Sequence, residues 1–162
     1  MLKKITFYVL FFCFLTVFHI NAANVSFLII EAGLPNNGRA HQYSTMWENG
    51  LLDVFFESGH IVSNAPVMRL PTRPDNGFPF EAERHYENAK TGGIEYFIIA
   101  IINYPVPGSA NSLPLSVALR LFNTESENMI HERVFSGLTQ RTTRDEYEII
   151  KKSIKEFAAT LD

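Results

Sequence analysis

A glycine-rich segment at residues 33–40 has the glycine spacing of a phosphate-binding loop. It reads Gly-Leu-Pro-Asn-Asn-Gly-Arg-Ala, and it lies between an apolar run and a helical pattern. Such loops use a lysine to contact the phosphates and a hydroxyl residue to bind magnesium, whereas this chain has Arg39 and Ala40 there. Pro35 also removes a backbone N–H donor that would hold phosphate. We therefore interpret the segment as a surface turn and expect no nucleotide.

Glu81 and His85 could place two ligands on one metal ion, because residues four apart share a face of a helix. Glu87 lies nearby, but no second pair of histidines or carboxylates has matching spacing. Three further histidines fall singly on different expected elements, at positions 41, 60 and 131. An exposed helical Glu-His pair explains the pattern, so we expect no metal and no cofactor.

A serine nucleophile is not indicated either. No serine lies in the Gly-x-Ser-x-Gly turn that presents the nucleophile of many hydrolases. Ser136-Gly137 closes an expected strand, whereas the hydrolase turn opens a helix. Trp47 fits the apolar stripe of an expected helix, which favours a place in the core over a stacking platform. We therefore predict no catalytic residues and a protein that is not an enzyme.

Residues 1–22 have the pattern of a secretory signal peptide and are excluded from the fold. Lys3 and Lys4 precede an almost wholly apolar run at residues 5–20, and Ala22 is a small residue at the expected cleavage point. The run is shorter than the about 20 residues that a spanning helix needs. We predict cleavage near Ala22 and a periplasmic or secreted protein, with membrane contact only if the segment is kept as an anchor.

Residues 23–162 are expected to form one α/β domain, since their number suits a single core. The only cysteine, Cys13, lies in the signal segment, so the mature chain has no thiol for disulfides or metal sites. The whole chain has 14 Lys and Arg against 17 Asp and Glu; without Lys3 and Lys4 it has 12 basic residues and a net charge of −5. This charge argues against a nucleic-acid partner.

The apolar pattern predicts strands and helices in alternation around a central strand at residues 94–104. That run is β-branched and aromatic almost throughout, which is typical of a strand covered on both faces. Strands are also predicted at residues 24–32 and 61–70. A helix with apolar residues from Tyr43 to Phe55 is expected to stop at Gly59, and a second helix to present Phe78, Ala82, Tyr86 and Ala89 on one face. This order implies parallel strands joined by right-handed crossovers.

The remaining chain predicts a hairpin and a closing helix. Leu115, Val117, Leu119 and Leu121 alternate with other residues, as in a strand with one well-buried face. In the return strand, residues 129–136, the alternation places Ile130 and Val134 on one face and Met129, His131, Arg133 and Phe135 on the other. A Thr143/Glu146 capping box opens a helix with an apolar stripe from Tyr147 to Leu161. The expected fold is an α/β mixed sheet, βαβαβ followed by a β-hairpin and a C-terminal helix, with about five strands and three helices.

The three parallel strands would end along one rim of the sheet, where ligands of open α/β sheets tend to bind. Three proline-rich loops meet there, at residues 33–41, 71–79 and 105–113. These loops can be plain surface connections, yet prolines reduce the entropy that a loop loses on binding, which suits a preorganised docking face better than a floppy tether. We predict that a protein partner binds this rim, through Asn36, Asn37, Arg39, Arg73, Asp75, Asn76 and Asn111.

Two stretches carry a family resemblance: Gly-Gly-Ile-Glu-Tyr-Phe-Ile-Ile from Gly92, and Leu-Ser-Val-Ala-Leu-Arg-Leu-Phe-Asn from Leu115, with a polar turn and a closing strand to Gly137. With the preceding strands and helices, nearly the whole mature chain is similar to the α/β module shared by the TolB amino-terminal domain, the periplasmic part of the curli secretion channel CsgG, and the penicillin-binding-protein activator lipoprotein LpoB. The family has a sequence like Gly-Ala-Asp-Tyr before the central strand, where this chain has Gly93-Ile94-Glu95-Tyr96.

The resemblance implies a non-enzymatic envelope protein that docks other proteins. We therefore expect a binding or scaffolding module with an envelope protein as its partner. A small hydrolase acting on a cell-envelope polymer is one alternative, and it would require carboxylate or histidine side chains that converge in a cleft. A small-ligand carrier is the other, and it would require a closed apolar pocket of about 300 Å³ or more.

Overall fold

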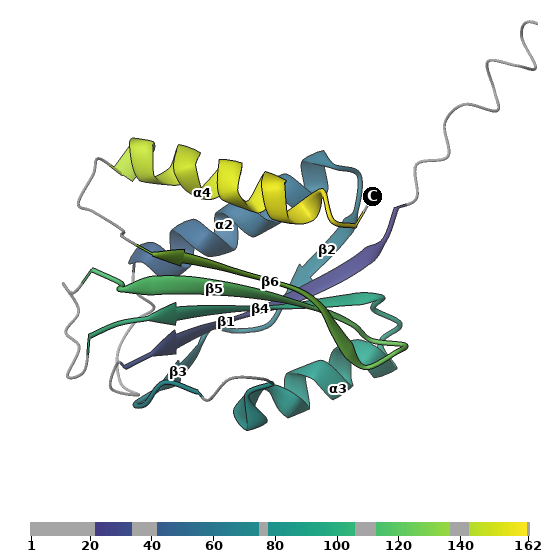
Figure 1. Ribbon diagram of the computed structural model, residues 1–162. Coiled ribbons are helices and arrows are strands. Elements are labelled where there is room, and N and C mark those ends of the chain that lie inside the picture. The colour runs from purple at the N-terminus through teal and green to yellow at the C-terminus, as the bar shows by residue number, and fades with distance from the viewer. Residues whose placement is uncertain (1–21, 34–41, 75–77, 106–112, 137–142, 162) are drawn as a thin grey trace, which may run out of the picture.

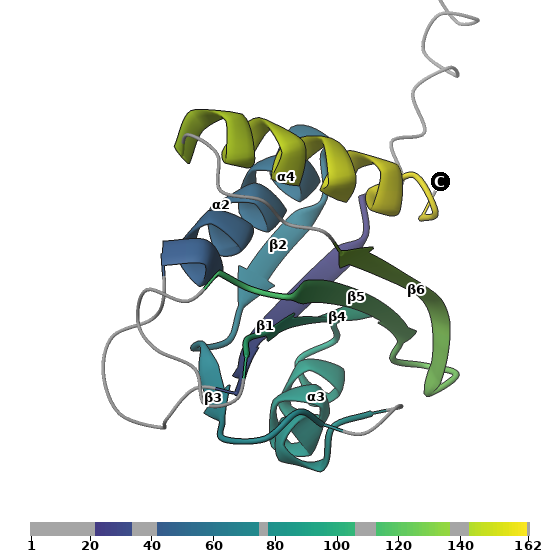
Figure 2. The same cartoon turned by 60° about the vertical axis from the view of Figure 1, so that its left-hand side comes forward.

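The computed structural model describes residues 22–33, 42–74, 78–105, 113–136 and 143–161, which form a mixed sheet of six strands with three helices packed on it. The strand order is β2-β1-β4-β5-β6, with β3 also beside β1. Two helices cover one face and one helix covers the other (Figures 1 and 2). This confirms the expected α/β class. The elements are β1 (Asn24–Ala32), α2 (Gln42–Glu57), β2 (Ile61–Asn64), β3 (Met68–Leu70), the 3-10 turn η1 (Phe80–Ala82), α3 (Glu83–Thr91), β4 (Tyr96–Asn103), β5 (Ser116–Asn123), β6 (Asn128–Ser136) and α4 (Thr143–Ala158).

The β1, β2, β3 and β4 strands are parallel, as the strand–helix alternation predicted. The prediction of one strand over residues 61–70 was wrong in detail, because that segment forms two short strands. The β2 strand pairs with the start of β1 and β3 with its end, and the break between them contains Pro66, which has no N–H for the ladder. The N–H of Ala65 still donates to the Phe27 carbonyl at 2.8 Å, which keeps the segment beside β1.

The middle strand of the sheet is β4, and it is buried on both faces as predicted. Alternate residues point to opposite sides: Ile98, Ala100 and Ile102 belong to the larger core cluster, and Phe97, Ile99 and Ile101 belong to the smaller one. The larger cluster lies under α2 and α4, and the smaller lies under α3. The two-sided core explains the near absence of polar residues from this run.

The α2 and α4 helices lie side by side on the larger core, so the apolar stripes predicted for both are confirmed. Trp47 is buried in that core, together with Ile150, Ile154 and Phe157 of α4. The α2 helix ends before Gly59, whose φ of 85° is a conformation that favours glycine. Within the described residues, no helix has the length and apolar character needed to cross a membrane.

The β5 and β6 strands form the predicted antiparallel hairpin, with two departures from the expected faces. The second face of β5 is buried too, because Ala118 and Phe122 belong to the smaller core. In β6 the register shifts by one residue, so that Leu121 pairs with His131 but Phe122 pairs with Met129. This bulge places Met129 on the α3 face of the sheet, and the prediction that it shares a face with His131 was wrong.

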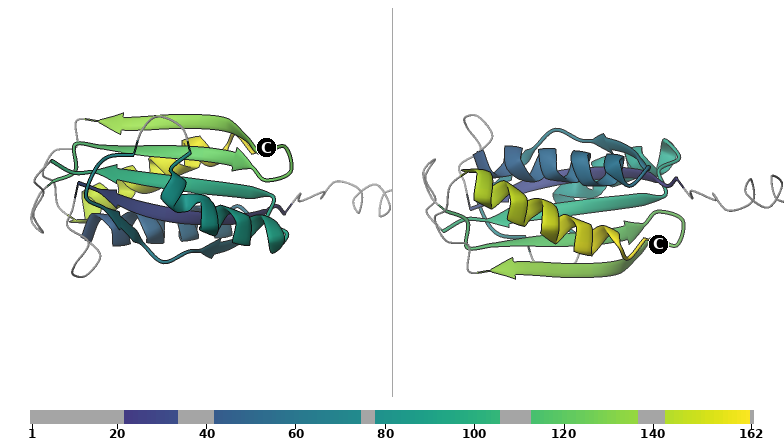
Figure 3. Two further views of the ribbon diagram at one scale, coloured as in Figure 1. Left: turned by 90° about the horizontal axis from the view of Figure 1, so that it is seen from below. Right: turned by 90° about the horizontal axis from the view of Figure 1, so that it is seen from above.

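The smaller core is covered by η1 and α3, which lie along β1 and β4 while β5 and β6 extend beyond them (Figure 3). Ala82, Tyr86 and Ala89 form the buried side of this segment, as predicted. Phe78 was expected on the same helical face but precedes η1 in the chain. Its ring nevertheless packs edge-on against the rings of Tyr86 and Phe122, at 5.1 Å in each case.

Candidate functional site

The β1, β3 and β4 strands end at one edge of the sheet, which is the rim expected to carry the site. Backbone hydrogen bonds join these ends: the Gly33 N–H donates to the Leu70 carbonyl and the Tyr104 N–H to the Ala32 carbonyl, both at 2.8 Å. Among the predicted rim residues Arg73 is described; it is exposed, and its Nη2 donates to the Tyr104 carbonyl at 3.4 Å. The other six, at positions 36, 37, 39, 75, 76 and 111, lie outside the described residues.

Beneath the rim lies a buried polar cluster of Glu31, Ser44 and Arg69, which we call the rim network. The Glu31 carboxylate is fully buried; one oxygen accepts a hydrogen bond from Ser44 Oγ and the other from Arg69 Nε. These three side chains come from β1, the first turn of α2, and β3. A buried ion pair contributes little net stability, because desolvation offsets the attraction, but it penalises any arrangement that separates the charges. The network therefore holds three elements in one geometry.

Tyr104 follows β4 and completes the buried layer under the rim. Burial raises the pKa of its phenol, and the negative charge of Glu31 raises it further. The phenol therefore keeps its proton at physiological pH, and it is unsuited to act as a nucleophile or a base. The fully buried Ser44 hydroxyl is likewise closed to a substrate. The chemistry available under the rim is positional, not catalytic.

Sequence reasoning did not find the rim network, although a signal was present. Glu31 stands near the end of a run that is otherwise apolar from Phe27, and Arg69 stands between apolar neighbours in the segment of residues 61–70. A charged residue inside a buried strand needs a partner, because an unpaired buried charge is costly. Pairing each such charge with one of opposite sign would have indicated this contact. Ser44 carries no comparable signal.

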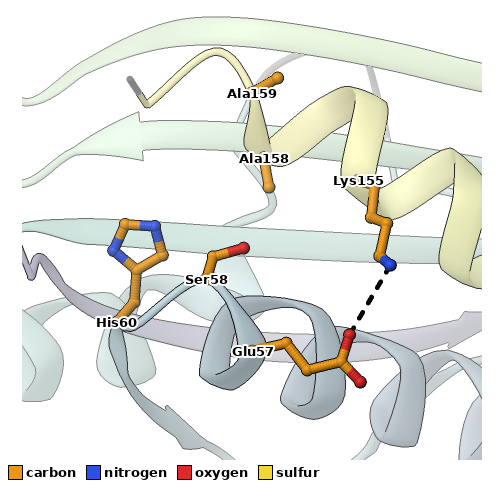
Figure 4. Close-up of a pocket in the computed structure, with 6 residues that line it drawn as sticks. All are labelled: Glu57, Ser58, His60, Lys155, Ala158 and Ala159. Carbon is orange, nitrogen blue, oxygen red and sulfur yellow. Dashed lines mark ion pairs between the residues drawn. The ribbon is translucent and has the colours of Figure 1, made fainter.

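A second candidate is a hollow of about 280 Å³ between the ends of α2 and α4, lined by Glu57, Ser58, His60, Lys155, Ala158 and Ala159 (Figure 4). It brings a serine, a histidine and a carboxylate together, as a hydrolase site would. The Ser58 hydroxyl points away from the imidazole, however, and His60 Nδ1 accepts the Ala23 N–H at 3.2 Å. Glu57 is held by Lys151 at 2.8 Å and by Lys155 at 3.7 Å. The three groups therefore do not form a relay.

The described residues contain no group of three or more His, Asp or Glu side chains that could hold a metal ion. Glu81 lies on η1 and His85 on α3, with no third ligand joining them in that part of the chain. The lowered pKa of Glu57 has a structural cause, since its hydrogen bond from Lys151 and the charge of that lysine both stabilise the carboxylate.

No protein-family model matches the sequence, and no curated protein matches it. Solved structures of similar fold include a single-substitution variant of the PelC dodecamer from Paraburkholderia phytofirmans (11% identity, TM-score 0.45, covering 87% of this chain and 90% of that one). TolB from Acinetobacter baumannii is also similar, with 13% identity and a TM-score of 0.41 over 86% of this chain and 29% of TolB. The LpoB C-terminal domain from Escherichia coli has 12% identity and a TM-score of 0.41 over 76% of this chain and 88% of that one. TolB and LpoB, to which the sequence was expected to be similar, are thus among the structures that resemble this fold, and similarity to CsgG stays a prediction.

Proposed function

We propose that this protein is a non-catalytic module of the cell envelope that binds another protein through the rim at the ends of β1, β3 and β4. The observation that carries the proposal is the rim network, because it joins the strand ends and the start of α2 under the loops that the sequence assigns to this surface. A partner that docks on loops anchored to a rigid scaffold loses less entropy on binding. The buried ion pair provides such an anchor.

Arg73 is the described residue best suited to contact the partner. It lies in an exposed segment between Pro71 and Pro74, and both prolines restrict the backbone before binding. Its guanidinium has five N–H donors, of which one contacts the Tyr104 carbonyl and the others find no acceptor among the described residues. In the proposal, Asn36, Asn37, Arg39, Asp75, Asn76 and Asn111 complete this polar surface. A carboxylate-bearing surface of the partner would match the two arginines.

The rim is tested by retention of an envelope protein on the immobilised domain. Arg39→Glu/Arg73→Glu should reduce retention of the partner about tenfold or more, as expected for a pair of interface arginines, without lowering the melting temperature. Lys152→Glu, at an exposed position on α4, is the control for charge reversal. Equal loss of retention in the double variant and the control would contradict the proposal.

The proposal includes export of residues 23–162 as one domain after cleavage near Ala22. The Ala23 nitrogen lies 3.2 Å from His60 Nδ1, so a new α-amino group at Ala23 would keep a hydrogen-bond acceptor beside it. Intact-mass measurement of the exported protein should give a chain that begins at or near Ala23. Retention of Lys3 and Lys4 in that chain would replace the soluble module with an anchored one.

A further inference from the structure

An open groove of about 370 Å³ lies on the α3 side of the molecule, between the η1–α3 segment and the β5–β6 hairpin; its lining residues are Phe78, Phe80, Glu83, Tyr86, Glu87, Phe122 and Glu127. The hairpin turn that borders the groove lies beside the start of β4, since the Thr124 N–H donates to the Glu95 carbonyl there. The rim lies at the opposite end of β4. The groove is therefore a second surface, although its Phe78 belongs to the loop of residues 71–79 that also holds Arg73.

The floor and wall of the groove are aromatic. The rings of Phe78, Tyr86 and Phe122 pack edge-on against one another, with centroids between 5.1 and 6.3 Å apart. Phe80 stands at the edge with 81% of its surface exposed. The β-bulge turns Met129, itself 46% exposed, to the side of Phe122, so the apolar surface continues from the groove onto β6. An isolated exposed phenylalanine is ordinary, but adjoining exposed apolar side chains of this size mark a contact surface.

The same groove carries unneutralised negative charge. Glu83 and Glu87 lie one turn apart on α3, and neither forms an ion pair with any described residue. The third carboxylate, Glu127, pairs with Lys90. Burial raises the pKa of the Tyr86 phenol, the charges of Glu127 and Glu87 raise it further, and the charge of Lys90 opposes them. The Tyr86 hydroxyl is buried and has no hydrogen-bond partner in the described part of the chain.

Glu127 occupies a backbone position that suits glycine better. Its φ is 58°, and among the described residues no other non-glycine residue has a positive φ. A β-carbon in this conformation is less favourable than glycine, because it lies close to the following carbonyl oxygen. The exposed ion pair with Lys90 returns little of that energy, because such pairs are screened by water. Glu127 therefore places a third carboxylate beside the aromatic groove, at a position where the backbone alone would favour glycine.

We propose that this groove binds a basic, apolar segment of a partner protein, in which a Leu- or Phe-like side chain adjoins Lys or Arg. The apolar side chain would lie against Phe78, Phe80 and Phe122, while the cation faces Glu83 and Glu87. The pairing of acidic with aromatic lining selects this occupant, since an acidic segment is repelled and a purely apolar one leaves the carboxylates without counter-charge.

The test uses the exported protein and a short fluorescein-labelled peptide of alternating leucine and lysine, followed by fluorescence anisotropy. Binding should be weakened about tenfold by Phe80→Ser, as expected for an aromatic anchor at an interface. It should be unchanged by Phe56→Ser, a matched control on α2 where 75% of the side chain is exposed. Glu87→Gln should weaken binding severalfold, whereas Glu148→Gln, which removes one charge from an exposed site on α4, should not.

Glu127→Gly separates a binding role from a structural one. The variant should fold with an equal or higher melting temperature, because glycine relieves the positive φ, yet it should bind the peptide more weakly, because the freed Lys90 ammonium repels lysine. Three results would overturn the proposal: equal effects of the Phe80 and Phe56 variants, equal binding of a leucine–glutamate peptide, or dimerisation abolished by Phe80→Ser, which would make the groove a contact between two copies.

Discussion

At the scale of single residues, the buried charge of Glu31 decides how the rim is built. Arg69→Ala should lower the free energy of unfolding by about 3–5 kcal/mol, because it leaves a fully buried carboxylate without its counter-charge. The double variant Glu31→Leu/Arg69→Met should recover most of that loss, since it replaces the ion pair with apolar side chains. Urea denaturation measures both. If the double variant were as unstable as Arg69→Ala, the ion pair would be a net source of stability and not a positional device.

Tyr147 links α4 to α2, and its titration should make the folded protein less stable at alkaline pH. Its hydroxyl donates to Asp53 Oδ2 at 2.5 Å, and burial, followed by this hydrogen bond, raises the pKa of the phenol to about 12. The unfolded value is about 10, so the folded state holds the proton more tightly. The resulting stabilisation is fully present below about pH 10 and is lost as the pH rises through about 12.

The check compares the wild type with Tyr147→Phe by urea denaturation at pH 9 and pH 12. The wild type should lose more unfolding free energy over this interval, because the variant has no proton to release at this position. Tyr86 and Tyr104, whose pKa values are also raised, titrate in both proteins and cancel in the comparison. Parallel losses in the two proteins would show that the Tyr147–Asp53 contact does not form.

At the scale of elements, the close approach of α2 and α4 depends on one glycine. A β-carbon at Gly50 would lie 2.9 Å from both Ile150 Cγ2 and Ile154 Cδ1, so any side chain must displace these two isoleucine side chains of α4. Gly50→Val should therefore cost about 1–3 kcal/mol of unfolding free energy, the usual range for overpacking. Asn49→Val, at the exposed neighbouring position, is the control that places the same β-branched side chain on α2. Thermal melting followed by circular dichroism measures the difference. Equal losses of stability in Gly50→Val and Asn49→Val would contradict the close approach of α2 and α4 at Gly50.

The boundaries of the strands agree with the sequence prediction in β1 and differ from it in the segment of residues 61–70 and in β6. The β1 boundaries matched the prediction, because a continuous apolar run between polar neighbours leaves little choice of ends. The segment of residues 61–70 did not, since Pro66 interrupts a ladder that can form only when β1 lies alongside. The bulge in β6 was also missed, because alternation counts positions along one strand, whereas a bulge is a property of two paired strands.

At the scale of the whole molecule, the two proposed surfaces are centred on opposite ends of β4, and the loop of residues 71–79 contributes to both through Arg73 and Phe78. The rim lies where the parallel strands end, and the groove lies where the hairpin turn meets α3. On the two proposals together, one molecule would contact two partners at once. The fold separates the two surfaces by the length of β4, so variants of one should leave binding at the other unchanged.

The order of strands and helices, their parallel arrangement and the burial of β4 on both faces could be predicted from the amino-acid sequence, because periodicity and apolar runs are local properties of a chain. The rim was predicted through the same topology, but six of its seven named residues lie outside the described part of the chain. The rim network and the acidic aromatic groove were not predicted from the sequence, because they depend on contacts between residues far apart in the chain. Glu31 and Arg69 are 38 positions apart, and Lys90 and Glu127 are 37 apart. The first pair meets through the register of β1 and β3, and the second through the packing of α3 beside the hairpin turn, and no local pattern encodes either.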